Sequence, residues 1–185
     1  KWHNLVKEFT QHVVDRYGID EVLTWYFEVW NEPNLNLNPK AGFFDGTKSD
    51  YFRMYKESVK AIKSIDKRLK VGGPATSNFI ADNRHDGEIM DHKKSVFYSQ
   101  DIINTKQWKG VWIEDFLRFC EKENLPVDFI STHPYPTDYA LDPDTGRSKD
   151  AIRYVHSLHD DITWLRQQIA SSKYPDAEVH LTEWS

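Results

Sequence analysis

Two glutamates of this chain follow apolar runs, in settings suited to acid and base chemistry. Glu32 comes after the aromatic and β-branched run 24–30, within Trp-Asn-Glu-Pro, and Glu183 ends a later apolar run within Leu-Thr-Glu-Trp. Paired carboxyl groups can share the work of glycoside hydrolysis, because one protonates the leaving oxygen while the other meets the developing oxocarbenium carbon. The neighbouring Trp and Tyr residues suit the apolar faces of sugar rings. The pair therefore indicates glycoside hydrolysis.

Each glutamate taken alone has a plainer explanation. Glu32 could be a carboxylate in a polar turn, and Glu183 could be an exposed charge at the end of a strand. Two observations favour the catalytic interpretation. Trp-Asn directly before Glu-Pro is a specific combination, and both glutamates follow strand-like segments.

The elements that would position this pair follow from the spacing of apolar residues, which predicts four helix and strand units. The expected helices cover residues 5–17, 51–65, 111–123 and 150–171, and the expected strands cover residues 24–30, 70–72, 127–132 and 178–182. Gly18 is expected to cap the first helix, and Ser49 or Asp50 the second. Helices alternating with strands imply a parallel α/β sheet with the helices packed outside it. Four such strands amount to half of a (β/α)8 TIM barrel.

In such a barrel, all strand ends converge on one face. The expected strands end in Asn31-Glu32-Pro33-Asn34, Gly72-Gly73-Pro74, His133-Pro134-Tyr135-Pro136 and Glu183-Trp184. Alternation along the first strand places Glu28, Trp30 and Glu32 inward, with Glu28 needing a basic partner from another strand. Residues 77–110 lack a sustained period and are expected to form a large loop on this face.

Bulk composition excludes several function classes. The 185 residues are enough for one domain but short for a complete barrel of roughly 250 residues. The net charge of −5 argues against a nucleic-acid partner. The apolar runs are too short for a membrane span. The lone Cys120 excludes an internal disulfide and is expected to be a buried thiol. The sequence does not decide the cellular compartment of the protein that contains this chain, and a secreted or periplasmic location is one alternative. It also leaves homo-oligomerisation undecided.

Several motifs resemble one glycosidase family in order along nearly the whole chain. The quoted segments are Arg16-Tyr17-Gly18, Trp25-Tyr26-Phe27-Glu28-Val29-Trp30-Asn31-Glu32-Pro33-Asn34-Leu35, Lys70-Val71-Gly72-Gly73-Pro74, Trp112-Ile113-Glu114-Asp115-Phe116-Leu117, Pro126-Val127-Asp128-Phe129-Ile130-Ser131 and Leu181-Thr182-Glu183. Together they resemble glycoside hydrolase family 39, the β-xylosidases and α-L-iduronidases. Asn-Glu-Pro alone is shared by a large clan, whereas Phe-Glu-Val-Trp-Asn-Glu-Pro-Asn with Val-Gly-Gly-Pro downstream is far more specific.

The resemblance implies roles for individual residues. Glu32 would be the general acid/base on barrel strand four and Glu183 the nucleophile on strand seven. Asn31 would bind the 2-hydroxyl of the sugar, and His133 and Tyr135 would line the glycone subsite. Trp184 and Phe44 are further substrate-binding candidates, with plain loop packing an equal alternative for Phe44. The family implies no metal and no cofactor.

These expectations combine into one functional hypothesis. Residues 1–185 would form a single partial barrel domain covering about strands 4 to 7, with a loop insertion at 77–110. The parent protein would be an exo-acting β-xylosidase that takes oligosaccharides or aryl glycosides by double displacement, with retained configuration. The alternatives are an α-L-iduronidase, an endo-glucanase-like enzyme of the same clan, and a non-catalytic carbohydrate-binding or structural half-barrel. The isolated 185 residues are expected to be inactive or nearly so.

Overall fold

The computed structural model describes residues 1–34, 43–77, 112–135, 137–141, 148–152 and 155–184. The helices are α1 (Trp2–Tyr17), α2 (Ile19–Val22), α3 (Lys48–Ile65), α5 (Ile113–Lys122) and α6 (Ser157–Ser171). The strands are β1 (Tyr26–Glu28), β2 (Lys70–Thr76), β3 (Phe129–Thr132), β4 (Thr137–Leu141), β5 (Ser148–Ile152) and β6 (Glu178–Leu181). None of the helices in these ranges is long and apolar enough to cross a bilayer.

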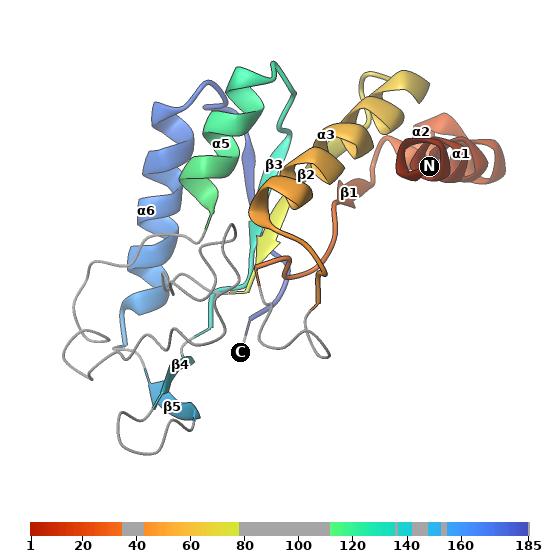
Figure 1. Cartoon of the computed structure of the whole chain (residues 1–185). Helices are drawn as coiled ribbons and strands as arrows, with labels where there is room; N and C mark the ends of the chain where they lie inside the picture. The colour runs from red at the N-terminus through yellow and green to blue at the C-terminus, as the bar shows by residue number, and fades with distance from the viewer. Residues whose placement is uncertain (35–42, 78–111, 136, 142–147, 153–154, 185) are drawn as a thin grey trace.

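The central element is a four-stranded parallel sheet in the order β1-β2-β3-β6 (Figure 1). Helices cover the sheet in chain order, with α1 against α3, α3 against α5, and α5 against α6. The predicted parallel α/β sheet with helices outside it is therefore confirmed. The insertion expected at 77–110 lies almost entirely outside the described residues.

The helix-covered face of the sheet holds the apolar core. Tyr51 and Tyr55 of α3 and Ile130 of β3 are fully buried, and Cys120 of α5 lies among them as expected. Burial raises the pKa of Tyr51 well above its usual value, so its hydroxyl stays protonated. That hydroxyl donates to the carbonyl oxygen of Val29 at 2.9 Å. This bond ties α3 to the backbone just beyond β1.

The opposite face of the sheet is aromatic and polar near the start of the strands. Tyr26, Phe129 and His180 form a ring cluster with centroids 4.5 to 5.4 Å apart. Tyr26 donates to Glu178 at 2.9 Å and accepts from Lys70 at 2.8 Å. These side chains belong to strands β1, β2, β3 and β6, so one layer of aromatic and polar side chains crosses the whole sheet. The hydroxyl of Tyr26 links a lysine on one strand to a glutamate on another.

The predicted helix over 150–171 was wrong at its start. Ser148–Ile152 forms strand β5, which pairs antiparallel with β4. Helix α6 begins only at Ser157, and Val155 is 88% exposed. The inward stripe of α6 is Ser157, Asp161, Leu165 and Ile169. Small polar residues at its beginning concealed the true start of the helix.

The predicted cap of α3 was also wrong. The cap is Thr47, whose hydroxyl accepts a hydrogen bond from the Asp50 amide, while the Asp50 carboxylate accepts from the Thr47 amide. This reciprocal pair is a capping box. Gly18 does cap α1, with a positive φ of 86° that glycine adopts without strain.

Replacing Thr47 by alanine is expected to lower the free energy of unfolding by about 1 kcal/mol, since an N-cap side chain is lost. Hydrogen bonds from the Thr47 backbone and side chain lower the pKa of Asp50. A carboxyl group whose pKa is lower in the folded state stabilises the folded protein at pH values above its unfolded-state pKa. This stabilisation is lost as the pH falls through the folded-state pKa. Denaturant unfolding of the complete gene product should therefore show a wild-type advantage that shrinks in acid. Thr47→Ser should behave as wild type at every pH.

Candidate active site

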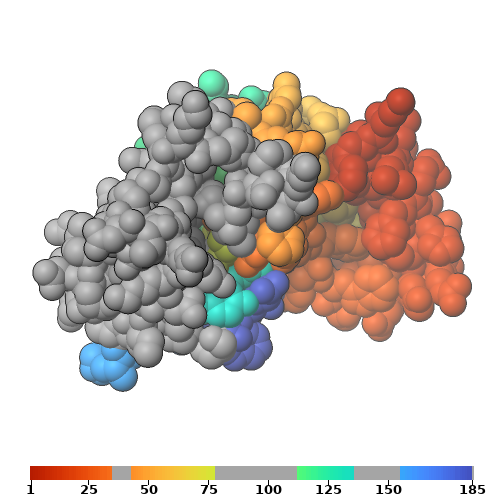
Figure 2. Space-filling view, turned by 60° about the horizontal axis from the view of Figure 1, so that its bottom comes forward, coloured from red at the N-terminus to blue at the C-terminus, as the bar shows by residue number. Residues whose placement is uncertain are grey.

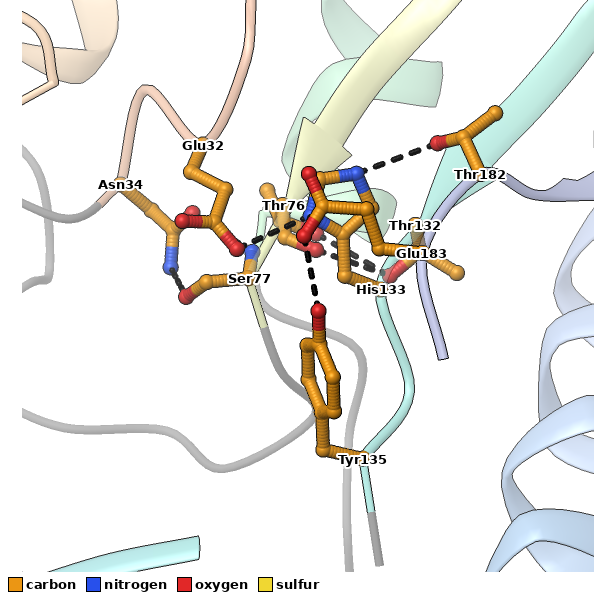
Figure 3. A network of polar contacts seen from close by, with 9 residues as sticks. All are labelled: Glu32, Asn34, Thr76, Ser77, Thr132, His133, Tyr135, Thr182 and Glu183. Atoms are coloured by element: carbon orange, nitrogen blue, oxygen red, sulfur yellow. Dashed lines mark hydrogen bonds and ion pairs between the residues drawn. The ribbon is translucent and has the colours of Figure 1, made fainter. Parts of the chain in front are cut away.

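Glu32, His133 and Glu183 meet beyond the carboxyl ends of strands β1, β3 and β6 (Figure 3). A carboxylate oxygen of each glutamate and one ring nitrogen of His133 all lie within 4.8 Å of one another. Three spacings of roughly 4.8 Å separate β1 from β6, about 14 Å across a flat sheet. The carboxyl groups approach because both long side chains extend toward His133, which lies between them.

His133 is the centre of this arrangement. Its ring is fully buried, and its Nδ1 lies 2.9 Å from Oε1 of Glu32. The same nitrogen lies 3.7 Å from Oε2 of Glu183, and Nε2 lies 3.1 Å from the hydroxyl of Thr182. One imidazole therefore connects both carboxyl groups.

The two glutamates differ in their surroundings. The Glu32 side chain is only 10% exposed, whereas that of Glu183 is 43% exposed. Tyr135 donates a hydrogen bond to Oε2 of Glu183 at 2.7 Å. The Glu183 carboxyl group is thus the more accessible of the two and accepts from a tyrosine, whereas the Glu32 carboxyl group is enclosed.

The backbone beyond the strands holds these residues in place. The amide of Glu32 donates to Ala75 at 2.9 Å, and the amide of His133 donates to Thr76 at 2.8 Å. Trp30 and Glu32 have positive φ angles of 71° and 45°, which non-glycine residues rarely adopt. The hydrogen bonds therefore continue the parallel ladder where the chain has already left the strand.

The predicted inward position of Trp30 was wrong, because the backbone changes direction at the positive φ angle of this residue. Its indole donates to the carbonyl oxygen of Phe43 and its ring contacts Trp2 of α1, because the turned backbone ends the alternation. Glu28 was also predicted to point inward and to need a basic partner. Its Oε2 is buried and has no hydrogen-bond partner among the described residues.

Sequence reasoning missed a polar clamp beside Glu32. The amide group of Asn34 donates to the Ser77 hydroxyl at 2.9 Å, and its oxygen accepts from the Ser77 backbone at 2.9 Å. Both residues are buried. The clamp joins the loop after β1 to the end of β2, next to the carboxyl group of Glu32. An asparagine just after Glu-Pro was the available signal.

The other predicted site residues lie around this centre. Asn31 is exposed beside Glu32, and Trp184 is 68% exposed after Glu183. Phe44 is half-buried and packs its ring against Trp30 and Tyr51, at centroid distances of 5.8 and 6.0 Å. Loop packing thus accounts for Phe44. Substrate contact stays a prediction for all three.

Figure 2 views the molecule toward the carboxyl ends of the strands. The end of β3 (teal) and the segment after β6 (blue) lie side by side at the surface there.

The spacing of Glu32, His133 and Glu183 would also suit a metal ion. Hydrogen bonding already accounts for it, since Nδ1 of His133 is engaged by Glu32 and Oε2 of Glu183 by Tyr135. The two carboxyl groups thus lie close together, with Nδ1 of His133 near both of them and the Tyr135 hydroxyl donating to one.

A family model described as glycosyl hydrolases family 39 matches residues 1–185. The chain belongs to this family. It is 34% identical over 185 residues to a β-xylosidase of Caldicellulosiruptor saccharolyticus, covering all of this chain and 30% of the relative. It is 31% identical to a β-xylosidase of Geobacillus stearothermophilus, with 100% and 31% coverage.

A crystal structure of a monomeric β-xylosidase from Caulobacter crescentus superimposes with a TM-score of 0.72 at 32% identity. That comparison covers 100% of this chain and 30% of the other. The chain therefore spans about a third of the length of the family 39 relatives it matches. The resemblance that the motifs indicated is confirmed.

Within this family 39 chain, Tyr135→Phe is expected to lower kcat about 10- to 100-fold with little change in KM, because a hydrogen bond to a charged group is lost. The measurement is steady-state hydrolysis of an aryl β-xyloside by the complete gene product. Tyr26→Phe is the matched control, since Tyr26 also donates to a glutamate, Glu178, at 2.9 Å, but at the opposite end of the sheet. Equal losses in both variants would contradict a specific role for Tyr135.

Proposed function

We propose that the protein containing this chain is a retaining glycoside hydrolase, an exo-acting β-xylosidase that releases xylose from xylo-oligosaccharides. Glu32 acts as general acid/base and Glu183 as nucleophile. The observation that carries the proposal is the approach of the two carboxyl groups, with oxygens within 4.8 Å. Retaining glycosidases hold their carboxyl groups about 5 to 5.5 Å apart, whereas inverting enzymes need roughly 6.5 to 9.5 Å for a water.

The division of roles follows from the environments of the two carboxyl groups. Glu183 accepts from Tyr135 and is the more exposed, which suits an oriented group that must reach the anomeric carbon. Glu32 is enclosed and hydrogen bonded to His133, which suits a group that carries a proton and later takes one back. Glu183 would form the glycosyl-enzyme bond while Glu32 releases the aglycone and then activates water.

We also propose that the sheet is part of a (β/α)8 barrel, covering about strands 4 to 7. Support comes from its parallel order, from helices on one face, and from the convergence of the strand ends. Oε2 of Glu28 is buried and has no hydrogen-bond partner in the described parts of the chain, which suits a cationic side chain from a strand outside them. The substrate would bind at the carboxyl ends, where such barrels place their active sites.

The test is hydrolysis of an aryl β-xyloside by the complete gene product, followed by proton NMR. We expect β-xylose as the first product, which then mutarotates. First appearance of α-xylose would overturn the retaining mechanism. Faster turnover of an aryl α-L-iduronide or of a polymeric β-glucan would replace the xylosidase assignment. A protein with both glutamates intact that hydrolyses none of these would support the non-catalytic alternative.

A further inference from the structure

Both ring nitrogens of His133 are engaged, but only Nδ1 faces the carboxyl pair. Two carboxylate oxygens lie near Nδ1, at 2.9 Å from Glu32 and 3.7 Å from Glu183. The hydroxyl of Thr182 lies 3.1 Å from Nε2. Thr182 directly precedes Glu183 and has no role in the proposed reaction so far. Its hydroxyl approaches the ring from the side opposite Glu32 (Figure 3).

The positions of these partners select one tautomer of a neutral ring. A bare nitrogen at Nδ1 would direct its lone pair at an oxygen of Glu183 and, whenever Glu32 has given up its proton, at Oε1 of Glu32, and both oxygens repel it. A proton at Nδ1 gives Glu32 a donor instead. Nε2 is then the bare nitrogen, and it needs a donor. The hydroxyl of Thr182 can donate or accept, so it can supply that hydrogen bond.

We propose that Thr182 is a positioning residue that holds His133 in the Nδ1–H tautomer and so keeps the acid proton on Oε2 of Glu32. This inference rests on the proposed function of Glu32. When Nδ1–H donates to Oε1, that oxygen is occupied as an acceptor. Among the described residues, Oε2 has no hydrogen-bond partner, and it points away from the ring. In this proposal the proton therefore stays on the oxygen that has no partner among the described residues, and that oxygen donates it to the substrate.

The other tautomer would disable the acid. With the ring proton at Nε2, Nδ1 has a lone pair and accepts a hydrogen bond from the protonated Oε1 of Glu32. The acid proton then points at the histidine instead of the substrate. In the working tautomer, the Oε2 proton passes to the glycosidic oxygen as the bond from that oxygen to the anomeric carbon breaks and Glu183 bonds to that carbon. In the second step Oε2 takes a proton from water as the water oxygen bonds to the anomeric carbon and the bond from that carbon to Glu183 breaks, which restores the starting state.

Substrates that differ in leaving group test the proposal. Thr182→Val removes the hydroxyl and keeps the shape, and Thr182→Ser keeps the hydroxyl. Thr182→Val is expected to lower kcat/KM on xylobiose about 10-fold, because the leaving sugar needs protonation. The kcat/KM of the same variant on 2,4-dinitrophenyl β-xyloside should stay within about twofold of wild type, because kcat/KM reports formation of the glycosyl-enzyme and this leaving group needs no acid. Thr182→Ser should resemble wild type on both substrates.

Other outcomes overturn the proposal. Equal losses of Thr182→Val on both substrates would indicate a structural role, and unchanged activity on both would show that the hydroxyl does not matter. Thermal unfolding of each variant checks that the fold is retained.

Nitrogen-15 NMR of labelled histidine tests the tautomer without relying on activity, with His133→Gln assigning the signal. Wild type should show a protonated Nδ1 and a bare Nε2, and Thr182→Val should shift toward the opposite pattern. A wild-type ring protonated at Nε2 would contradict the inference directly. If the protein hydrolyses no xyloside yet shows the Nδ1–H tautomer, the proposed function fails while the hydrogen-bond assignment stands.

Discussion

Replacing Glu183 by alanine is expected to lower kcat on an aryl β-xyloside by roughly 10⁴-fold or more, as removal of a nucleophile does in enzymes that form covalent intermediates. Without the carboxylate, no glycosyl-enzyme can form. Added azide should restore part of the turnover by attacking the anomeric carbon directly. The product should then be α-xylosyl azide, because a single displacement inverts the configuration.

Glu178→Ala is the matched control for this experiment. Glu178 lies in the same strand, β6, and is hydrogen bonded to Tyr26 and His180 at the other end of the sheet. It should retain nearly full activity. Loss of activity in Glu178→Ala equal to that in Glu183→Ala would show that the strand, and not the carboxylate, is what matters. A β-configured azide product from Glu183→Ala would assign the nucleophile to another residue.

Glu32→Gln is expected to lower kcat/KM on xylobiose by roughly 10²- to 10⁴-fold, the usual contribution of a general acid/base. The amide keeps the size of the side chain but cannot donate the catalytic proton. Formation of the glycosyl-enzyme from 2,4-dinitrophenyl β-xyloside should be affected least. The intermediate should then accumulate, because the base for the second step is missing, and a burst of dinitrophenol would report it.

Azide distinguishes this variant from the first. With Glu32→Gln, azide should attack the accumulated intermediate and give β-xylosyl azide, since two displacements retain the configuration. Glu21→Gln, an exposed glutamate before β1, should behave as wild type. Identical losses of Glu32→Gln on xylobiose and on the dinitrophenyl substrate would rule out a role for Glu32 as the acid.

The sequence was sufficient to predict the layout of the sheet and the approach of the two glutamates. Apolar periodicity located all four parallel strands within a few residues. The carboxyl ends of parallel strands meet at one edge, so the sequence alone predicts that Glu32 and Glu183 lie close together. Their roles remain predictions that rest on the environments of the two carboxyl groups and on the family.

Elements that depend on long-range pairing were harder to predict. The apolar pattern around Ile152 fitted a helix, but the backbone of Ser148–Ile152 pairs with β4 instead. Strand β1 ends at Glu28, earlier than the aromatic run suggested, because the backbone turns at Trp30. Tertiary hydrogen bonding decides both cases, and local residue type does not encode it.

The hydrogen-bond partners within the site were also outside the reach of the sequence. Thr182 and Ser77 are ordinary hydroxyl residues, and nothing in their neighbours shows that one meets a histidine ring and the other an asparagine amide. Such pairs join residues 43 and 49 positions apart. His133 and Tyr135 were predicted to line the sugar subsite. In the structure each is hydrogen bonded to a catalytic candidate, Glu32 or Glu183.

Strands β2 and β3 separate β1 from β6, and this separation limits which acidic side chain can act at the site. Glu32 and Glu183 follow strands that lie three spacings apart in the sheet, and one carboxylate oxygen of each nevertheless lies within 4.8 Å of the other beside His133. Aspartate is one methylene shorter, a retraction of about 1.5 Å at the carboxyl group. A misplacement of about 1 Å can cost roughly 10²-fold in rate. The choice of glutamate over aspartate is thus a matter of reach, although the two acids share one functional group.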